Sequence, residues 1–94
     1  MASSKIVLTP KAEEDLQEIY LYLFDYSPNA AVAQIERILD KIELLEQFPQ
    51  LGQVIPDFEN ENLRELKIGN YLIAYYIVSD KQIDILTVHR SSRP

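Results

Sequence analysis

The pattern of hydrophobic positions divides the chain into a helical first half and a strand-rich last third. After Pro10 and again after Pro28, apolar residues recur three or four positions apart, which places them on one face of a helix. The sequence therefore predicts two amphipathic helices. Their stripes are Ala12, Leu16, Ile19, Tyr20 and Leu23, then Ala31, Ile35, Ile38, Ile42 and Leu45, with Leu39 and Phe48 widening the second.

Both helices carry the same start signal. Thr9-Pro10 and Ser27-Pro28 each place a hydroxyl residue at the N-cap and a proline at the first helical position, where its missing N–H costs nothing. The short link between the helices predicts an antiparallel hairpin, and the second helix is expected to end before Pro49. A short β-branched run before Thr9, residues 4–9, predicts a first strand.

The last third predicts three strands, over residues 63–68, 71–79 and 82–89. Gly69-Asn70 and Asp80-Lys81 fit the two-residue turns that join antiparallel strands. Residues 50–62 show no clear period and are expected to form a loop with at most a short extended piece. The predicted fold is a single α+β domain over residues 1–94, β-α-α-β-β-β, with the helix hairpin packed on one face of an antiparallel sheet.

Two-residue turns fix the strand register, so the two faces of the sheet can be assigned. Leu66, Ile73 and Val88 form one cross-strand row, with Tyr75 paired to Leu86 beside it, and this face is expected to receive the helices. The other face, the open face, has no element left to cover it and is partly apolar, which is typical of a partner surface. Its expected rows are Lys67–Leu72–His89, Glu65–Ala74–Thr87 and Leu63–Tyr76–Ile85.

Charge is distributed unevenly along the chain. Residues 1–62 carry 4 Lys+Arg against 12 Asp+Glu, whereas residues 63–94 carry 5 against 3. A pI of about 4.6 argues against a nonspecific nucleic-acid binder, so any basic patch must lie on the C-terminal strands. There is no cysteine, and no apolar run approaches the roughly 20 residues of a membrane span. We expect a cytoplasmic protein without a cofactor, metal site or membrane partner.

Three side chains of the open face could carry chemistry. Glu65, Lys67 and His89 supply the carboxylate, ammonium and imidazole that cleavage of RNA by transesterification requires. The alternative is that they are solvated charges on an exposed sheet, and we favour that interpretation. Tyr76, on the same face, could anchor a partner or stack on a base. Arg90 and Arg93 form either an arginine pair for an anionic partner or a solvated tail.

The chain resembles the RelE/ParE superfamily of toxins from type II toxin–antitoxin modules. The matching pieces are LTPKAEEDLQEIYLYL, SPNAAVAQIERILDKIELLEQFPQLG, LRELKIGNYLIAYYIV and IDILTVHRSSR, which cover nearly the whole chain in order. The resemblance implies a helix hairpin on an antiparallel sheet and a co-encoded antitoxin that fills the open face. It also implies an association with plasmid stabilisation.

The sequence looks closer to the ParE branch, whose characterised members poison DNA gyrase without recognised catalytic residues. RelE-like members cut messenger RNA on the ribosome and typically place an arginine where this chain has Leu72. Many relatives place a histidine where this chain has Arg90. The preferred hypothesis is a gyrase-binding toxin, more consistent with a non-enzyme, that uses the C-terminal strand and tail with Arg90 and Arg93 as electrostatic contacts. The candidate partner-binding residues are Leu72, Ala74, Tyr76, Thr87, Arg90 and Arg93.

Two alternatives stay open. One is a ribosome-dependent messenger RNA endoribonuclease that uses Glu65, Lys67 and His89. The other is a degenerate module that binds only its antitoxin. The sequence also leaves open whether the chain forms a homodimer or a toxin–antitoxin hetero-oligomer.

Overall fold

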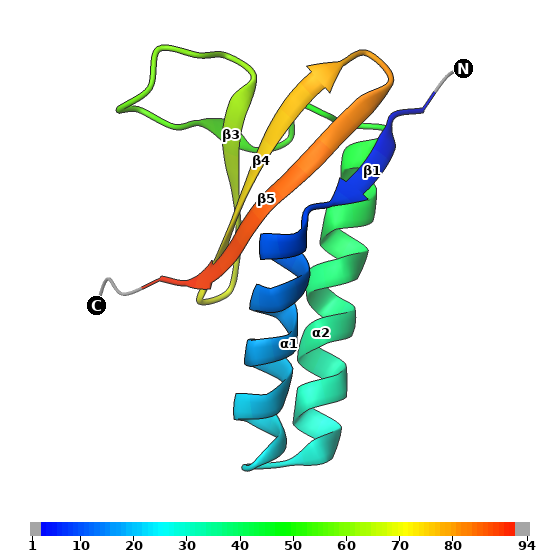
Figure 1. The fold of residues 1–94 in the computed structure, drawn as a ribbon, viewed down its shortest axis with the longest axis vertical. Coiled ribbons are helices and arrows are strands. Elements are labelled where there is room, and N and C mark those ends of the chain that lie inside the picture. Colours follow the sequence, from blue (N-terminus) through cyan, green and yellow to red (C-terminus); the bar gives the residue numbers. More distant parts are fainter. Residues whose placement is uncertain (1–2, 92–94) are drawn as a thin grey trace.

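The computed structural model describes residues 3–91 of the chain, which form a five-stranded sheet with a helix hairpin on one face (Figure 1). The strand order is β1-β5-β4-β3-β2, with β1 parallel to β5 and the other pairs antiparallel. The predicted fold class is confirmed. The elements are β1 (Lys5–Leu8), α1 (Pro10–Phe24), α2 (Pro28–Glu43), the 3-10 turn η1 (Leu44–Glu46), β2 (Gln53–Val54), β3 (Leu63–Ile68), β4 (Tyr71–Ser79) and β5 (Gln82–Arg90).

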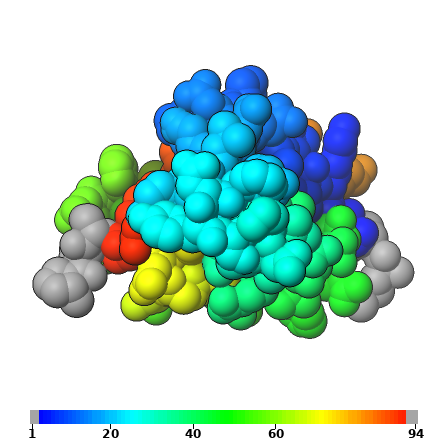
Figure 2. Space-filling model, turned by 90° about the horizontal axis from the view of Figure 1, so that it is seen from below, coloured from blue at the N-terminus to red at the C-terminus, as the bar shows by residue number. Residues whose placement is uncertain are grey.

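Both helices begin where the sequence predicts. The Thr9 hydroxyl accepts a hydrogen bond from the Ala12 N–H, and the Ser27 hydroxyl accepts one from the Ala30 N–H, each at 3.2 Å. These side chains satisfy amide groups that have no partner within the first turn of a helix. The hairpin runs past the end of the sheet, so its tip projects in front of the other elements when the molecule is viewed along it (Figure 2).

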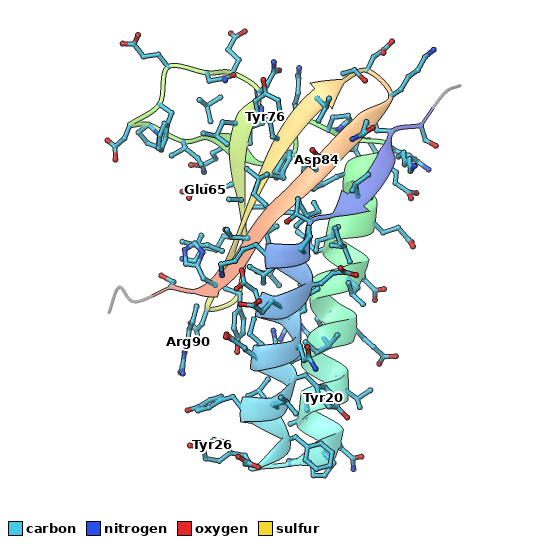
Figure 3. All side chains as sticks on the ribbon, viewed as in Figure 1. Tyr20, Tyr26, Glu65, Tyr76, Asp84 and Arg90 are labelled. Carbon is cyan, nitrogen blue, oxygen red and sulfur yellow. The ribbon has the colours of Figure 1, made fainter. Side chains whose placement is uncertain are left out.

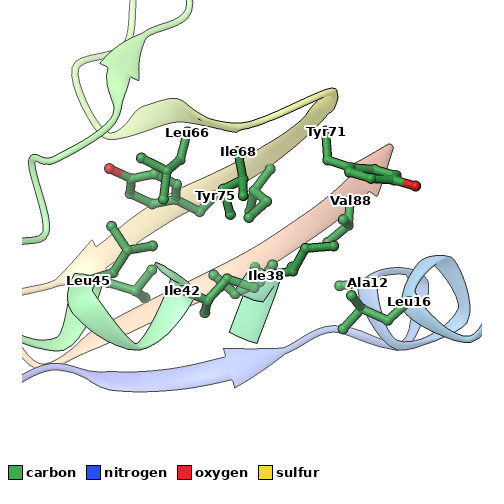
Figure 4. Close-up of a cluster of buried hydrophobic side chains, with 13 residues drawn as sticks. Ala12, Leu16, Ile38, Ile42, Leu45, Leu66, Ile68, Tyr71, Tyr75 and Val88 are labelled. Carbon is green, nitrogen blue, oxygen red and sulfur yellow. The ribbon is translucent and has the colours of Figure 1, made fainter. Parts of the chain in front are cut away.

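The core lies between the hairpin and the inner face of the sheet (Figure 4). Side chains of β3, β4 and β5 meet those of both helices and η1, and Ile6 and Leu8 of β1 pack against them. Burial of this apolar surface is the main force that holds the two layers together. The buried cluster consists of Ala12, Leu16, Ile38, Ile42, Leu45, Leu66, Ile68, Tyr71, Ile73, Tyr75, Ile83, Ile85 and Val88.

The predicted register holds throughout the β3–β4 pair and over the last part of β5. Leu66 pairs with Ile73 and Ile73 with Val88, and both two-residue turns are present. Gly69 has a φ of 55°, whereas Asn70 has a negative φ. A type II′ hairpin turn requires this combination, and it places glycine at the first central position.

The predicted register between β4 and β5 is wrong by one residue from Tyr75 to Ile77, and a second shift before Ser79 restores it at the Ser79–Gln82 pair. A β-bulge follows the Ala74–Thr87 pair, so that Tyr75 pairs with Ile85 rather than Leu86, and Tyr76 with Asp84 rather than Ile85. Leu86 is the extra residue of this bulge. Ile85 is therefore 0% exposed in the core instead of lying on the open face.

The bulge contacts the start of α1. There the Thr9 hydroxyl donates to the Ile85 carbonyl at 2.7 Å and to the Leu86 carbonyl at 3.2 Å.

Within residues 3–91, no helix is long and apolar enough to cross a membrane.

Candidate functional site

The open face is the surface of β3, β4 and β5 that points away from the helix hairpin. It carries Glu65 and Lys67 from β3, Leu72, Ala74 and Tyr76 from β4, and Thr87 and His89 from β5. A hollow of about 580 Å³ lies over one end of this face. Its walls are Glu65, Lys67 and Leu72 together with Ile55, Pro56 and Asp57 of the β2–β3 loop and Ser91.

The predicted row Lys67–Leu72–His89 is present. Lys67 pairs with Leu72, and Leu72 pairs with His89 on its other side. Because neighbouring strands are about 4.8 Å apart, the backbones of Lys67 and His89 are separated by about 10 Å. The half-buried Leu72 lies between Lys67 and His89 in this row. The centre of the row is thus apolar.

The second predicted row, Glu65–Ala74–Thr87, is also present. Glu65 is half-buried and lines both the main hollow and a smaller one of about 190 Å³. Lys67 lines the same two hollows. Within residues 3–91, the one ion pair joins Lys11 and Asp15, so Glu65 and Lys67 do not neutralise each other. A carboxylate and an ammonium group therefore both face the space where a ligand would sit.

Tyr76 lies on the open face, as predicted, at the far end from His89. It is half-buried and sits between Leu63 and Asp84, two residues of the neighbouring strands. Asp84 accepts a hydrogen bond from the Gln82 side chain at 2.9 Å. Figure 3 shows Glu65, Tyr76 and Asp84 in the part of the sheet that is remote from the hairpin tip. This end of the open face can offer an aromatic ring beside a carboxylate.

One wall of the smaller hollow is fixed by a buried tyrosine. The Tyr75 hydroxyl accepts a hydrogen bond from the Gly52 N–H at 2.8 Å and donates one to the Pro49 carbonyl at 2.7 Å. Burial raises the pKa of the Tyr75 phenol, so it stays protonated and can donate. A Cβ at Gly52 would lie 2.6 Å from the Glu65 carbonyl, which explains why glycine stands there.

The Arg64 guanidinium ties the same loop to β3. It donates to the carbonyls of Glu61 and Gly52 at 2.8 and 2.9 Å, and to that of Gln50 at 3.5 Å. The Arg64 guanidinium therefore binds backbone carbonyls of the loop and does not contribute to the open face. These contacts hold the segment between η1 and β3 in place beside the candidate site.

Arg90 is on the other side of the sheet from Leu72, Ala74, Tyr76 and Thr87. It pairs with the buried Tyr71 and lines a hollow of about 250 Å³ with Glu18, Ile19 and Tyr22 of α1. Figure 3 shows its side chain beside α1, between the sheet and Tyr26. The two-residue alternation of a strand explains this position, because Val88 faces the helices and Arg90 is two residues further on. Arg93 lies outside the described residues.

Arg90 joins a pair of tyrosines that the sequence did not single out. The Tyr22 and Tyr26 hydroxyls are 3.4 Å apart and their rings meet edge to face. The hydrogen bond with Tyr26, and after it the nearby Arg90 guanidinium, lower the pKa of Tyr22. The hydrogen bond with Tyr22 raises the pKa of Tyr26. Spacing of four residues on a helix is the signal that could have revealed this pair.

Asp15 is a second residue whose role was not evident from the sequence. It is buried, pairs with Lys11, and accepts a hydrogen bond from the Val88 N–H at 2.9 Å. Beyond the end of β1, the Asp15 carboxylate accepts the hydrogen bond that a neighbouring strand would otherwise accept from β5. It so positions the part of β5 that carries Thr87 and His89.

Within residues 3–91, no group of three histidine, aspartate or glutamate side chains is placed to hold a metal ion.

Comparison with known proteins gives a consistent set of matches. Residues 6–94 match the family model of the ParE toxin of the type II toxin–antitoxin system parDE. Toxin RelE3 of Caulobacter vibrioides is 30% identical over 79 residues, which cover 80% of this chain and 82% of that protein.

Two solved structures have a similar fold. One, from the chromosomal ParDE toxin–antitoxin system of P. aeruginosa, has a TM-score of 0.77 and 26% identity, and the match covers 96% of this chain and 98% of that chain. The other, from the RelBE2 toxin–antitoxin complex of Mycobacterium tuberculosis, has a TM-score of 0.62 and 18% identity, covers 96% and 99% of the two chains, and bears on the fold alone.

Proposed function

The chain belongs to the ParE family of toxins of type II toxin–antitoxin systems, within the RelE/ParE superfamily, and from this premise we propose that it acts by binding its target rather than by catalysis. DNA gyrase is the proposed target. A co-encoded antitoxin is the proposed neutralising partner. The similarity to chains of a ParDE system and of a RelBE2 complex supports that partner.

The observation that carries this proposal is the apolar residue that lies between Lys67 and His89 on the open face. Cleavage of RNA needs a cation beside the scissile phosphate, because negative charge develops there in the transition state. Leu72 fills the position between Lys67 and His89 and provides no such charge. An apolar centre with polar groups at its edges is instead the usual anatomy of a protein–protein interface.

We propose that the antitoxin covers the open face and contacts Leu72, Ala74, Tyr76 and Thr87. These four residues lie on β4 and β5, and all of them are half-buried. A half-buried apolar surface gains further stabilisation when a partner removes it from water. We propose that the target binds the same open face, so that the antitoxin blocks it. Arg90 lies on a different side of the molecule and would add a separate contact with the target.

Ribosome-dependent cleavage of messenger RNA is the second candidate function. It is favoured by one observation, namely that Glu65 and Lys67 line one hollow and that His89 lies in the same cross-strand row as Lys67. A carboxylate and an imidazole on either side of a bound phosphate could act as general base and general acid. This mechanism leaves the phosphorane to be stabilised by Lys67 alone.

The test is induction of the chain alone in a bacterial host, followed by a supercoiling assay with purified DNA gyrase. In cells, we expect growth arrest with filamentation and an SOS response. In the gyrase assay, we expect supercoiling to decrease as the concentration of the added toxin rises. Rapid loss of messenger RNA with unaffected supercoiling would support the ribonuclease instead. Normal growth at good expression would reject both toxic activities and leave a module that binds only an antitoxin.

A further inference from the structure

Another hollow, remote from the open face, has the properties of a binding groove. It has a volume of about 610 Å³, within the range of ligand sites, and we call it the Phe48 groove. Its walls come from the segment after η1 and from the distal end of β4. They are formed by Gln47, Phe48, Pro49, Gln50, Leu51, Asn62, Ile77, Ser79 and Asp80.

Large apolar side chains are exposed in this groove against expectation. The helical pattern predicts that Phe48 continues the buried stripe of α2, yet the helix ends at Glu43 and the Phe48 side chain is 56% exposed. Leu51 is also exposed, and the half-buried Ile77 lies at the base of the same hollow. Exposed apolar groups that share one hollow indicate a site for an apolar group of a partner.

The walls of the groove are fixed before any partner binds. The buried Tyr75 hydroxyl holds the Pro49 carbonyl, and the Leu51 N–H donates to the Phe48 carbonyl at 3.0 Å. On the opposite wall, the Ile77 N–H donates to the Asn62 carbonyl at 2.9 Å. A preformed groove loses little conformational freedom when it is occupied, and this favours binding.

The polar groups of the groove indicate the chemistry of the occupant. Gln47, Gln50 and Asn62 each offer a side-chain amide, which can both donate to and accept from a peptide backbone. Asp80 is the one charged residue among the lining residues, and it is a carboxylate. A nucleic acid would bring phosphates toward this carboxylate, whereas a peptide with a cation beside its apolar side chain would match it.

We propose that the Phe48 groove binds a segment of a partner protein that inserts one large apolar side chain and places a lysine or arginine next to Asp80. The overall net charge of −6 would further attract such a segment. This inference does not depend on which target or antitoxin the chain has, because it rests on the groove alone.

The test is an NMR titration of the ¹⁵N-labelled full chain with capped dipeptides. N-acetyl-phenylalanyl-lysine amide should shift the amide signals of Phe48, Leu51, Ile77 and Asp80, with a Kd of about 1–10 mM. The glutamate analogue should bind about threefold more weakly. The alanyl-lysine analogue should cause no saturable shift. Equal binding by all three peptides, or shifts confined to other residues, would overturn the proposal.

Variants separate the groove from the rest of the surface. Phe48→Ala should weaken the phenylalanyl-lysine peptide about fivefold or more. Phe58→Ala is the matched control, because Phe58 is 55% exposed and is not part of the groove, and it should change nothing. Asp80→Asn should remove the preference for lysine over glutamate, whereas Asp25→Asn at the hairpin tip should keep it.

Two further results would also reject the proposal. One is wild-type affinity in a folded Phe48→Ala protein. The other is a shift of the groove signals by hexauridylate instead of the peptides, since that would identify a nucleic-acid site.

Discussion

At the scale of single residues, Tyr75 connects the core to the segment that separates the two main hollows. Its ring is buried and its hydroxyl is bound to both Gly52 and Pro49. The open face and the Phe48 groove therefore share one structural support. Loss of this hydroxyl should lower the stability of the whole domain, because it leaves the Gly52 N–H and the Pro49 carbonyl without this partner.

We expect Tyr75→Phe to lower the free energy of unfolding by about 1–3 kcal/mol, the usual cost of an unsatisfied buried polar group. Urea denaturation followed by circular dichroism measures this change. Tyr76→Phe is the matched control, because no hydrogen bond of the Tyr76 hydroxyl to another described residue exists in the structure, and it should stay within about 0.5 kcal/mol of the wild type. Equal effects of the two variants would contradict the role of the Tyr75 hydroxyl.

Tyr22 should ionise before Tyr26 and Tyr75. The hydrogen bond from Tyr26 and the neighbouring Arg90 guanidinium stabilise its phenolate, so its pKa lies below the ordinary 10.0. Burial raises the pKa of Tyr75, which should therefore ionise later. NMR titration of ¹³C-labelled tyrosine side chains measures this order.

Two substitutions test the causes of the Tyr22 shift. Both Tyr26→Phe and Arg90→Gln should raise the pKa of Tyr22, because each removes a group that favours the phenolate. Lys67→Gln, on the other face of the sheet, should leave it unchanged. An unaltered pKa in Arg90→Gln would mean that Arg90 does not lie against α1 in solution.

At the scale of elements, the junction of β1 and α1 organises the part of the sheet that carries the candidate site. Thr9 caps α1 and also binds two carbonyls of β5 across the bulge. Six residues further along, Asp15 binds the Val88 N–H. The start of α1 thus replaces β1 as the neighbour of β5 and keeps Thr87 and His89 on the open face.

Thr9→Ala should therefore cost more than the loss of a helix cap alone. We expect about 2–3 kcal/mol, since the cap and the contacts with β5 are lost together. Ser27 caps α2 through a hydrogen bond of the same length as that of Thr9, but its side chain makes no hydrogen bond to the sheet. Ser27→Ala should therefore lower the free energy of unfolding by about 1 kcal/mol. Thermal unfolding ranks the two variants. A larger loss in Ser27→Ala would refute the proposed role of the junction.

Local signals were sufficient to predict most elements. The Thr9-Pro10 and Ser27-Pro28 starts, the two turns and the β3–β4 register depend on neighbouring residues, and the structure confirms them. The bulge at Leu86 has no signal among its neighbours in the sequence, and the hydroxyl that binds its carbonyls, that of Thr9, is more than seventy positions away. The end of α2 before Phe48 was also missed, although Phe48 has the right spacing for the apolar stripe.

The same distinction applies to the candidate site. The rows that contain Glu65, Lys67, Leu72 and His89 follow from turn lengths and alternation, so their placement on the open face was predictable. The loss of Ile85 from that face follows from the bulge and was not. Arg90 was treated as part of a tail, whereas β5 continues to this residue and alternation turns it toward α1.

At the scale of the whole molecule, the fold covers one face of the sheet and leaves the other available. The helix hairpin supplies a single layer, and the short β2–β3 loop reaches only one end of the open face. The chain is a toxin of the ParE family, and the proposed antitoxin would supply the missing layer. The proposed binding mechanism requires the open face to act through its shape and apolar centre rather than through its ionisable groups.

Growth of cells that express the double variant Glu65→Ala, His89→Ala tests this central claim most directly. The control is Leu72→Asp, which places a charge at the centre of the same face, and circular dichroism must show that both proteins are folded. If toxicity depends on binding, the double variant should arrest growth as the wild type does, whereas Leu72→Asp should be much less toxic. A folded double variant that allows normal growth would contradict binding and point to cleavage of RNA.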